Sequence, residues 1–328
     1  MSMNAKENFL ALVNGGQPDA LVDEWEPFGF VFDPLMGITL VARPGEYVVD
    51  PWGVTIYLGE NEPGAMPIVN DENKVIKDVT CWKDTVHAPD LQVPLDWTEA
   101  KKQAEEIRAQ GKLVTSLMAT GLFEQMHYLM GFEDSLMNLL LEPDDVHELL
   151  NYLTEYKLEY AKLLVENLHP DVVLFHDDWG SKTSLFMQPD TWREFFKERY
   201  TKIYSYFREN GVIVIHHSDS YCQPIVQDMI DVGINVWQGV LPQNDIPAIQ
   251  KEVGRKLVLM GGIDAPAIDQ ADWSEEKVRA EVRRACDAYA PGGNFIPCLT
   301  YGGDGSIFPG VNDVIMDEIR KLSPKYFA

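Results

Sequence analysis

Residues 212–220 read VIVIHHSDS, and this stretch decides the fold. Four consecutive β-branched residues predict a strand that is buried on both faces, as in a parallel sheet. The polar residues that follow then lie at the carboxyl end of the strand, where ligands bind in parallel α/β folds. His217 and Asp219 are two residues apart, so their side chains share a face if the extended conformation continues. An imidazole and a carboxylate on one face can bind a divalent metal or move a proton.

The same pattern occurs at four other places in the chain. Apolar segments that start near residues 112, 171, 256 and 294 each run into polar or glycine-rich residues. The helices expected around them span residues 98–110, 124–131, 133–140, 144–167, 190–210, 222–232, 245–253, 274–290 and 311–322. This alternation predicts an α/β protein with a single (β/α)8 TIM barrel. Residues 1–95, rich in proline, glycine and aromatic residues, predict an irregular N-terminal extension. Residues 96–328 then form the regular barrel, with the whole chain as one domain.

Composition excludes several classes of partner. The 328 residues carry a formal net charge of -25, with a pI of about 4.5. Such a surface repels nucleic acid and anionic lipid. No apolar run approaches the roughly 20 residues of a membrane helix, and residues 1–8 lack an apolar signal core. We therefore expect a cytoplasmic protein without nucleic-acid or membrane partners, whose four scattered cysteines are thiols or ligands.

The residues after the strands allow more than one interpretation. His217 and Asp219 suit a metal site, but also a hydrogen-bonded pair that closes a loop. Of His216 and His217, one faces the barrel and the other faces the helices, and the sequence does not say which. Cys298, at another strand end, is a candidate ligand or a small buried residue.

Two adjacent carboxylates, Asp177 and Asp178, follow the strand that starts near residue 171. Buried carboxylates carry a desolvation cost unless they are paired or used, although one of the two can cap the following segment. Trp179 and Trp237 are core residues or a platform for a flat ligand. Glu124 begins a helix, where an acid also complements the helix dipole.

Several segments together resemble the uroporphyrinogen decarboxylase superfamily. The resemblance covers nearly the whole chain and is closer to the corrinoid-dependent methyltransferase branch, of the O-demethylase methyltransferase I type. The matching pieces are DPWGV at 50–54, residues 64–67, KDVTCW at 77–82, GLFE at 121–124, GFE at 131–133, HDDWG at 176–180, HSD at 217–219, GGID at 261–264 and Cys298. The superfamily fold is a (β/α)8 barrel, which agrees with the strand pattern.

The decarboxylase itself fits poorly. That enzyme has an arginine-rich N-terminal motif, whereas this chain has VDEWEP at residues 22–27. A substrate with many carboxylates needs guanidinium groups, and these strand ends offer acids instead. We therefore expect a neutral or cationic substrate.

The methyltransferase resemblance implies zinc and a corrinoid (cobalamin) carried by a partner protein. Many members hold zinc with a His-x-Cys pair and a distant Cys, and here the matching positions are His217, Asp219 and Cys298. Asp219 replaces the middle cysteine of this set, so one thiolate ligand is lost. This loss suits those members of the methyltransferase branch that open methyl ethers or methylamines. In this reading His176, Asp177 and Asp178 are catalytic. Trp179, Trp237, Glu124 and His216 line the substrate pocket.

The corrinoid protein would dock at the strand carboxyl ends, with the loop at residues 300–306 in the docking surface. The chain contains no Asp-x-His-x-x-Gly run of its own for a corrinoid. Two alternatives remain: a decarboxylase-like lyase, and a non-catalytic binding protein on the same barrel.

Overall fold

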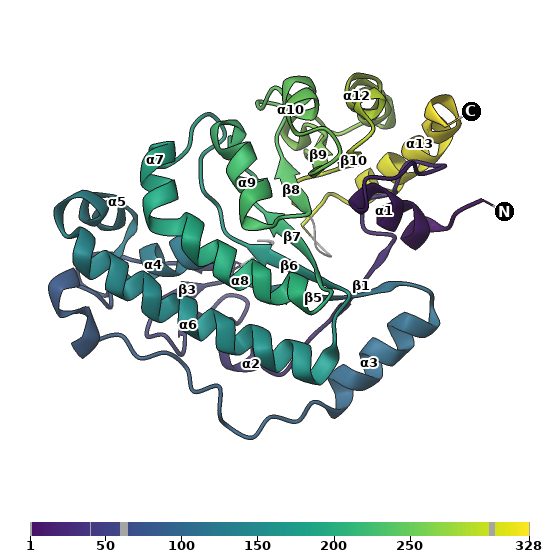
Figure 1. Ribbon diagram of the computed structural model, residues 1–328. Coiled ribbons are helices and arrows are strands. Elements are labelled where there is room, and N and C mark those ends of the chain that lie inside the picture. Colours follow the sequence, from purple (N-terminus) through teal and green to yellow (C-terminus); the bar gives the residue numbers. More distant parts are fainter. Residues whose placement is uncertain (1, 40, 60–64, 302–305, 328) are drawn as a thin grey trace.

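A parallel sheet of seven strands forms the centre of the computed structural model, which describes residues 2–39, 41–59, 65–301 and 306–327 (Figure 1). Its order is β1-β5-β6-β7-β8-β9-β10. The strands are β1 Phe28–Val31, β5 Leu113–Met118, β6 Val172–His176, β7 Ile213–His217, β8 Val236–Val240, β9 Val258–Gly262 and β10 Phe295–Cys298. The α/β class is therefore confirmed.

The sheet curls, because side chains from all seven strands meet in one hydrophobic cluster on its inner face. Among the described residues no eighth strand pairs β10 with β1, so the closed eight-stranded barrel is not confirmed. The two edges are linked through Glu24, whose Oε1 accepts the Leu299 N–H at 3.1 Å. The architecture is TIM-barrel-like, with a seam between β1 and β10.

Most of the helices cover the outer face of the sheet (Figure 1). The helices are α1 Ala5–Val13, α2 Met36–Thr39, α3 Thr98–Ala109, α4 Leu122–Met130, α5 Phe132–Leu141, α6 Pro143–Leu168, α7 Pro189–Trp192, α8 Glu198–Glu209, α9 Val226–Val232, α10 Ile246–Val253, α11 Ala265–Ile268, α12 Glu275–Tyr289 and α13 Val311–Tyr326. The exception is α1, which places Phe9 and Leu12 in the inner cluster. The long α6 begins with Pro143 and two acids in its first turn, as expected at the positive end of a helix dipole. None of the helices in the described ranges is both long and apolar enough to cross a membrane.

The segment before residue 96 is more regular than expected. Phe28–Val31 is the first strand of the central sheet, and β2 Tyr47–Val49, β3 Thr55–Tyr57 and β4 Met66–Pro67 form a small antiparallel sheet. Gly29 allows α3 to pack closely on β1, because a Cβ there would lie 2.6 Å from Ile107 Cγ2. The N-terminal extension therefore supplies one strand of the central sheet.

Alternation along the strands decides which side chains reach the interior. In β6, Val172 and Leu174 belong to the inner cluster, whereas Val173 and Phe175 pack against the helices. Full burial of such an apolar side chain contributes about 1.5–3 kcal/mol. If β6 shifted by one residue, its inward and outward side chains would exchange faces. Burial of these side chains therefore fixes the register of the strand.

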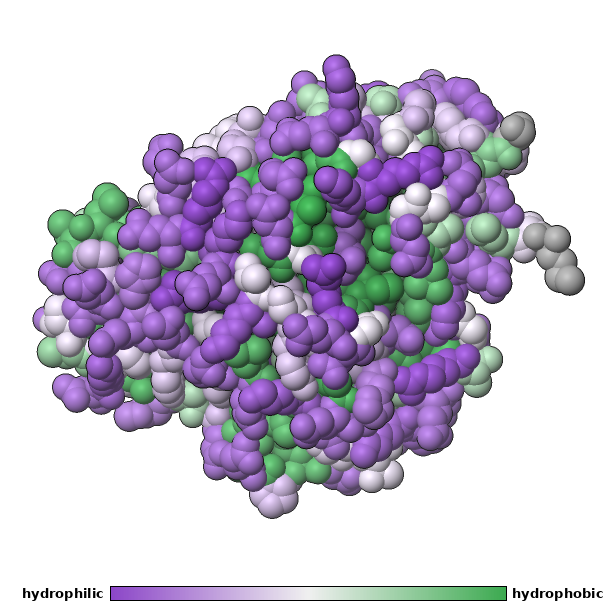
Figure 2. Space-filling view, in the orientation of Figure 1, coloured by the Kyte–Doolittle hydropathy of each residue, from purple (hydrophilic) through white to green (hydrophobic). Residues whose placement is uncertain are grey.

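The outer surface is mostly hydrophilic, in keeping with the net charge. Figure 2 shows a green patch at the left edge, where α5 lies, and Leu140 and Leu141 are 76% and 67% exposed there.

Candidate metal and substrate site

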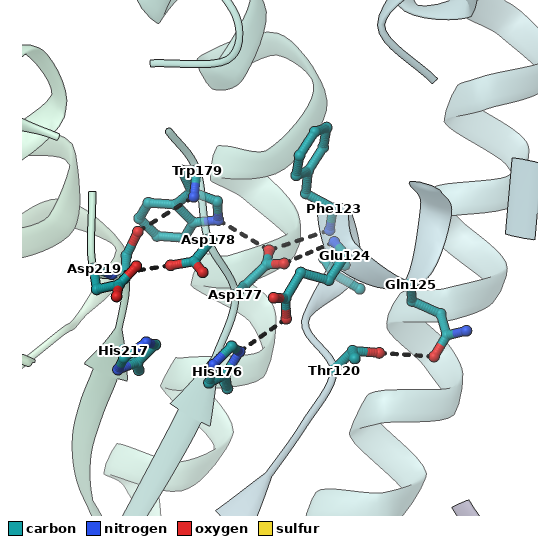
Figure 3. Close-up of polar contacts among 12 residues, drawn as sticks. Thr120, Phe123, Glu124, Gln125, His176, Asp177, Asp178, Trp179, His217 and Asp219 are labelled. Atoms are coloured by element: carbon teal, nitrogen blue, oxygen red, sulfur yellow. Dashed lines mark hydrogen bonds and ion pairs between the residues drawn. The ribbon is translucent and has the colours of Figure 1, made fainter. Parts of the chain in front are cut away.

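His176 and His217 form the centre of the candidate site. They end the paired strands β6 and β7 in register, and their rings stack with centroids 4.3 Å apart. Each follows inner-face residues at alternate positions, Leu174 before His176 and Ile215 before His217. Both imidazoles therefore lie on the inner side, at the carboxyl end of the sheet (Figure 3).

Each ring is oriented through its Nδ1 atom. His176 Nδ1 lies 2.9 Å from Glu124 Oε2, and His217 Nδ1 contacts Gln238 Oε1. Neither Nε2 forms a hydrogen bond or ion pair with another described residue, so Nε2 is the nitrogen that remains for a ligand. Metal-binding histidines are typically held in this way, by a carboxylate or carbonyl on the second ring nitrogen.

Asp178 completes a group of three possible metal ligands. One ligand atom each from His176, Asp178 and His217 lies within 4.8 Å of the other two. Asp178 Oδ1 also accepts the backbone N–H of Asp219 at 2.9 Å, which fixes the carboxylate (Figure 3). Two nitrogen donors and one oxygen donor match the three protein ligands of a catalytic zinc site, which keeps its fourth position open.

The ligand set expected from the sequence overlaps this group at His217 alone. Asp219 contributes its backbone amide to Asp178, and its side chain is not among the three clustered ligands. Cys298 lies on the inner face, where its Sγ donates to the Leu299 carbonyl and lies 3.9 Å from Gln238 Nε2. Binding by His217, Asp219 and Cys298 thus stays a prediction, and the geometry favours the set with His176 and Asp178.

The two histidines differ in charge. Burial opposes protonation of His176, but Glu124 outweighs it and raises the pKa of His176 to about 10. Burial and the nearby charge of His176 lower the pKa of His217 to about 3. Without a metal, His176 and Glu124 therefore form an ion pair beside a neutral imidazole. A metal would displace a proton from His176.

Asp177 anchors the start of α4 and does not face the two histidines. It is fully buried, with Oδ1 accepting the Glu124 N–H and Oδ2 accepting the Phe123 N–H, the Trp179 indole N–H and the Tyr200 hydroxyl. Burial raises the pKa of Asp177, although these donors favour the ionised form. Since Glu124 follows directly in α4, this anchor also positions the partner of His176.

Three residues expected in the substrate pocket lie on the helix side of the sheet. His216 is buried, stacks on Trp179 with centroids 3.9 Å apart, and its Nδ1 lies 2.7 Å from the Tyr204 hydroxyl. Trp237 is also buried and donates to the Ser218 carbonyl. These residues support the strand ends from behind and are not part of the site proposed below.

A cavity of about 390 Å³ opens beside His176. Its lining includes His176, Thr120, Gln125 and a lysine of α6, Lys157, which the sequence reasoning missed. A second cavity, of about 640 Å³, lies along the seam beside Glu24 and Leu174. Leu117 of β5 borders both cavities.

A curled parallel sheet with polar residues at its strand carboxyl ends is the architecture of barrel-type α/β enzymes. The model of the uroporphyrinogen decarboxylase (URO-D) family matches residues 48–311, and the chain belongs to this family.

Two comparisons with individual proteins agree with this assignment. A uroporphyrinogen decarboxylase of Thioalkalivibrio sulfidiphilus (strain HL-EbGR7) is 24% identical over 195 residues, which cover 56% of this chain and 51% of that protein. The match therefore spans about half the length of that relative. A methyltransferase from Methanosarcina mazei has the same fold, with a TM-score of 0.70, 19% identity and 100% coverage of both chains.

Proposed function

We propose that this chain is a methyltransferase that moves a methyl group from a small methylated compound to the Co(I) of a corrinoid on a separate protein. Zinc would be held by His176, Asp178 and His217. Family membership and the fold shared with a methyltransferase support this proposal. The observation that carries it is the convergence of three ligand atoms within 4.8 Å, with both imidazoles held through Nδ1.

Neighbouring residues hold the side chains of His176, Asp178 and His217 in position for a cation. Glu124 and Gln238 fix the ring planes, and the backbone of Asp219 fixes Asp178. When bound, zinc supplies Lewis acidity toward the heteroatom that carries the methyl group. The reaction would take place at the strand ends, so the corrinoid protein must reach this face. Of the loop expected to contribute to docking, residues 302–305 lie outside the described part of the chain.

A carboxy-lyase is the second candidate function, because the matched relative is a uroporphyrinogen decarboxylase. The segment at residues 22–27 lacks the arginines that would hold a polycarboxylate. Turnover of uroporphyrinogen without any corrinoid would favour this reading. A chain that binds zinc but turns over neither class of substrate would favour the non-catalytic alternative.

Metal analysis tests the ligand set. We expect one zinc per purified chain, and a large loss of zinc in His176→Ala and His217→Ala. Cys298→Ala should retain zinc, as should His87→Ala, a control at an exposed histidine. Loss of zinc in Cys298→Ala but not in His176→Ala would instead establish the set with Asp219 and Cys298.

A parallel assay tests the reaction. The protein is mixed with cob(I)alamin and a panel of methyl ethers and methylamines, and formation of methylcobalamin is followed by absorbance. Chelator treatment should abolish transfer. Demethylation at full rate without any corrinoid would contradict the proposed function.

A further inference from the structure

Lys157 is a buried cation that has no hydrogen-bond or ion-pair partner among the described residues. It lies in the middle of α6, and 2% of its surface is exposed. No hydrogen bond or ion pair joins its Nζ to any residue in the described ranges. Burial lowers the pKa of Lys157 to about 8, against the opposing charges of Asp177 and Glu124, so the ammonium is mostly protonated near neutral pH. An unpaired buried ammonium is costly, which points to a partner that arrives from outside.

The space in front of Lys157 is the cavity that also reaches His176. Its walls include the apolar side chains of Trp52, Ile56 and Leu117. Its volume of about 390 Å³ is suitable for a small molecule, because ligand pockets typically measure about 300–1,000 Å³.

Neutral polar side chains also line the cavity that contains Lys157. Gln125 Nε2 is buried and has no hydrogen-bond partner, while its Oε1 accepts the Thr120 hydroxyl at 2.9 Å. The Tyr128 hydroxyl keeps its proton, because burial raises its pKa. The acid in the lining is Asp50, whose Oδ1 accepts the backbone N–H groups of Trp52 and Val54. The cavity therefore offers an ammonium and an unused amide N–H donor.

We propose that Lys157 recognises a carboxylate on the substrate, and that this cavity takes small, apolar, ring-sized monocarboxylates. The rest of the molecule would lie in the part of the cavity that His176 borders. That this end carries the transferred methyl group rests on the proposed function. The inference revises the sequence-based expectation of a neutral or cationic substrate.

A single carboxylate fits these donors better than a more highly charged anion does. One ammonium matches one negative charge, and Gln125 can donate to the second carboxylate oxygen. A phosphate or a polycarboxylate would require further cations. None is found among the described residues that line this cavity apart from Lys157 and His176.

Binding of benzoate and of benzamide, its neutral isostere, tests the proposal by titration calorimetry. The wild-type protein should bind benzoate at least tenfold more tightly than benzamide. Lys157→Met and Lys157→Gln should remove this preference. The matched control, Lys162→Met, changes an exposed lysine of the same helix that pairs with Glu159, and it should leave the preference unchanged.

Stability separates recognition from a structural role. If Lys157 serves to bind a ligand, its buried ammonium does not stabilise the free protein. Lys157→Met and Lys157→Gln should then unfold at the same or a higher urea concentration than the wild type. The proposal is overturned if the wild type does not prefer benzoate, if either Lys157 variant keeps the preference, or if both variants are strongly destabilised.

The outcome is independent of catalysis. Preference for benzoate through Lys157, without methyl transfer from methoxybenzoate, would sustain this inference and reject the proposed function. Equal transfer from anisole and methoxybenzoate, unaffected by Lys157→Met, would sustain the function and reject the inference.

Discussion

Asp177 and Asp178 are adjacent carboxylates that should respond in opposite ways to the same substitution by asparagine. In Asp177→Asn, the amide oxygen can replace Oδ2 and keep three donors, but the amide NH2 then faces the Glu124 N–H. A buried donor without an acceptor costs about 1–3 kcal/mol, and hydrogen bonds to a neutral acceptor are weaker than those to a charged one. We expect the free energy of unfolding to fall by about 2–4 kcal/mol.

Asp178→Asn should instead preserve the fold. Burial and the charges of Glu124 and Asp219 raise the pKa of Asp178 to about 8, so without metal the side chain is mostly neutral at pH 7. Asparagine keeps an acceptor for the Asp219 N–H, and the change in stability should stay below about 1 kcal/mol. Zinc content and methyl transfer should fall sharply, because an amide is a poorer zinc ligand than a carboxylate.

Urea unfolding followed by circular dichroism, with zinc analysis of the same samples, measures both effects. Asp96→Asn is the control, since this exposed aspartate also accepts a backbone N–H, that of Thr98. The reasoning is refuted if the Asp177 and Asp178 variants lose equal stability, or if Asp178→Asn retains full zinc and activity.

Three further outcomes follow from the same geometry. Glu124→Gln should weaken zinc binding by about 10–100-fold, measured by competition with a chelator, and unchanged affinity would show that Glu124 does not orient His176. Gly121→Ala should lower the melting temperature markedly, because its Cβ would lie 2.1 Å from the Cβ of Asp177; an unchanged melting temperature would mean that α4 can move away. Burial raises the pKa of Glu24 from 4.5 to about 7. As pH rises, the unfolded chain therefore loses the Glu24 proton at a lower pH than the folded protein does. Stability should therefore fall as pH rises from about 4.5 to 7, by up to about 3 kcal/mol, and then level off. Glu24→Gln should flatten that pH profile, and an identical profile would be evidence against a buried protonated Glu24.

Most of the sheet was predictable from the sequence because its strands are continuous apolar runs. Five strands and the major helices lie close to their expected positions. The strands β1 and β8 were missed, since glycine interrupts both and weakens the apolar signal. The closed eight-stranded barrel was inferred from the repeat of the pattern, and local sequence holds no information on whether the edges pair.

The candidate site was predictable in part. The carboxyl ends of β6 and β7 were identified correctly as the place where polar residues gather, but the choice between His216 and His217 needs the register of the sheet. Alternation puts His217 on the same face as Ile213 and Ile215, but only the structure shows that this face is the inner one. Pairing His176 with His217 depends on the two strands being neighbours in register, which neither strand reveals alone.

Lys157 was missed because helical lysines are usually solvated. It lies four residues from Leu153 and Ala161 on α6, so it occupies a position on the buried face of the helix. A lysine within an apolar helical stripe is the signal that would have marked it. What it faces is set by β5 and the segment around Trp52, which are distant in sequence.

The position of Leu117 has a consequence for how this scaffold can diversify. Its side chain borders both the cavity beside His176 and the larger one along the seam. A smaller residue there would add space between two cavities of about 390 and 640 Å³ without altering the histidines. A bulkier residue would narrow the chamber beside His176. Under the proposed function, one position on β5 thus adjusts the size of the accepted molecule separately from the residues of the metal site.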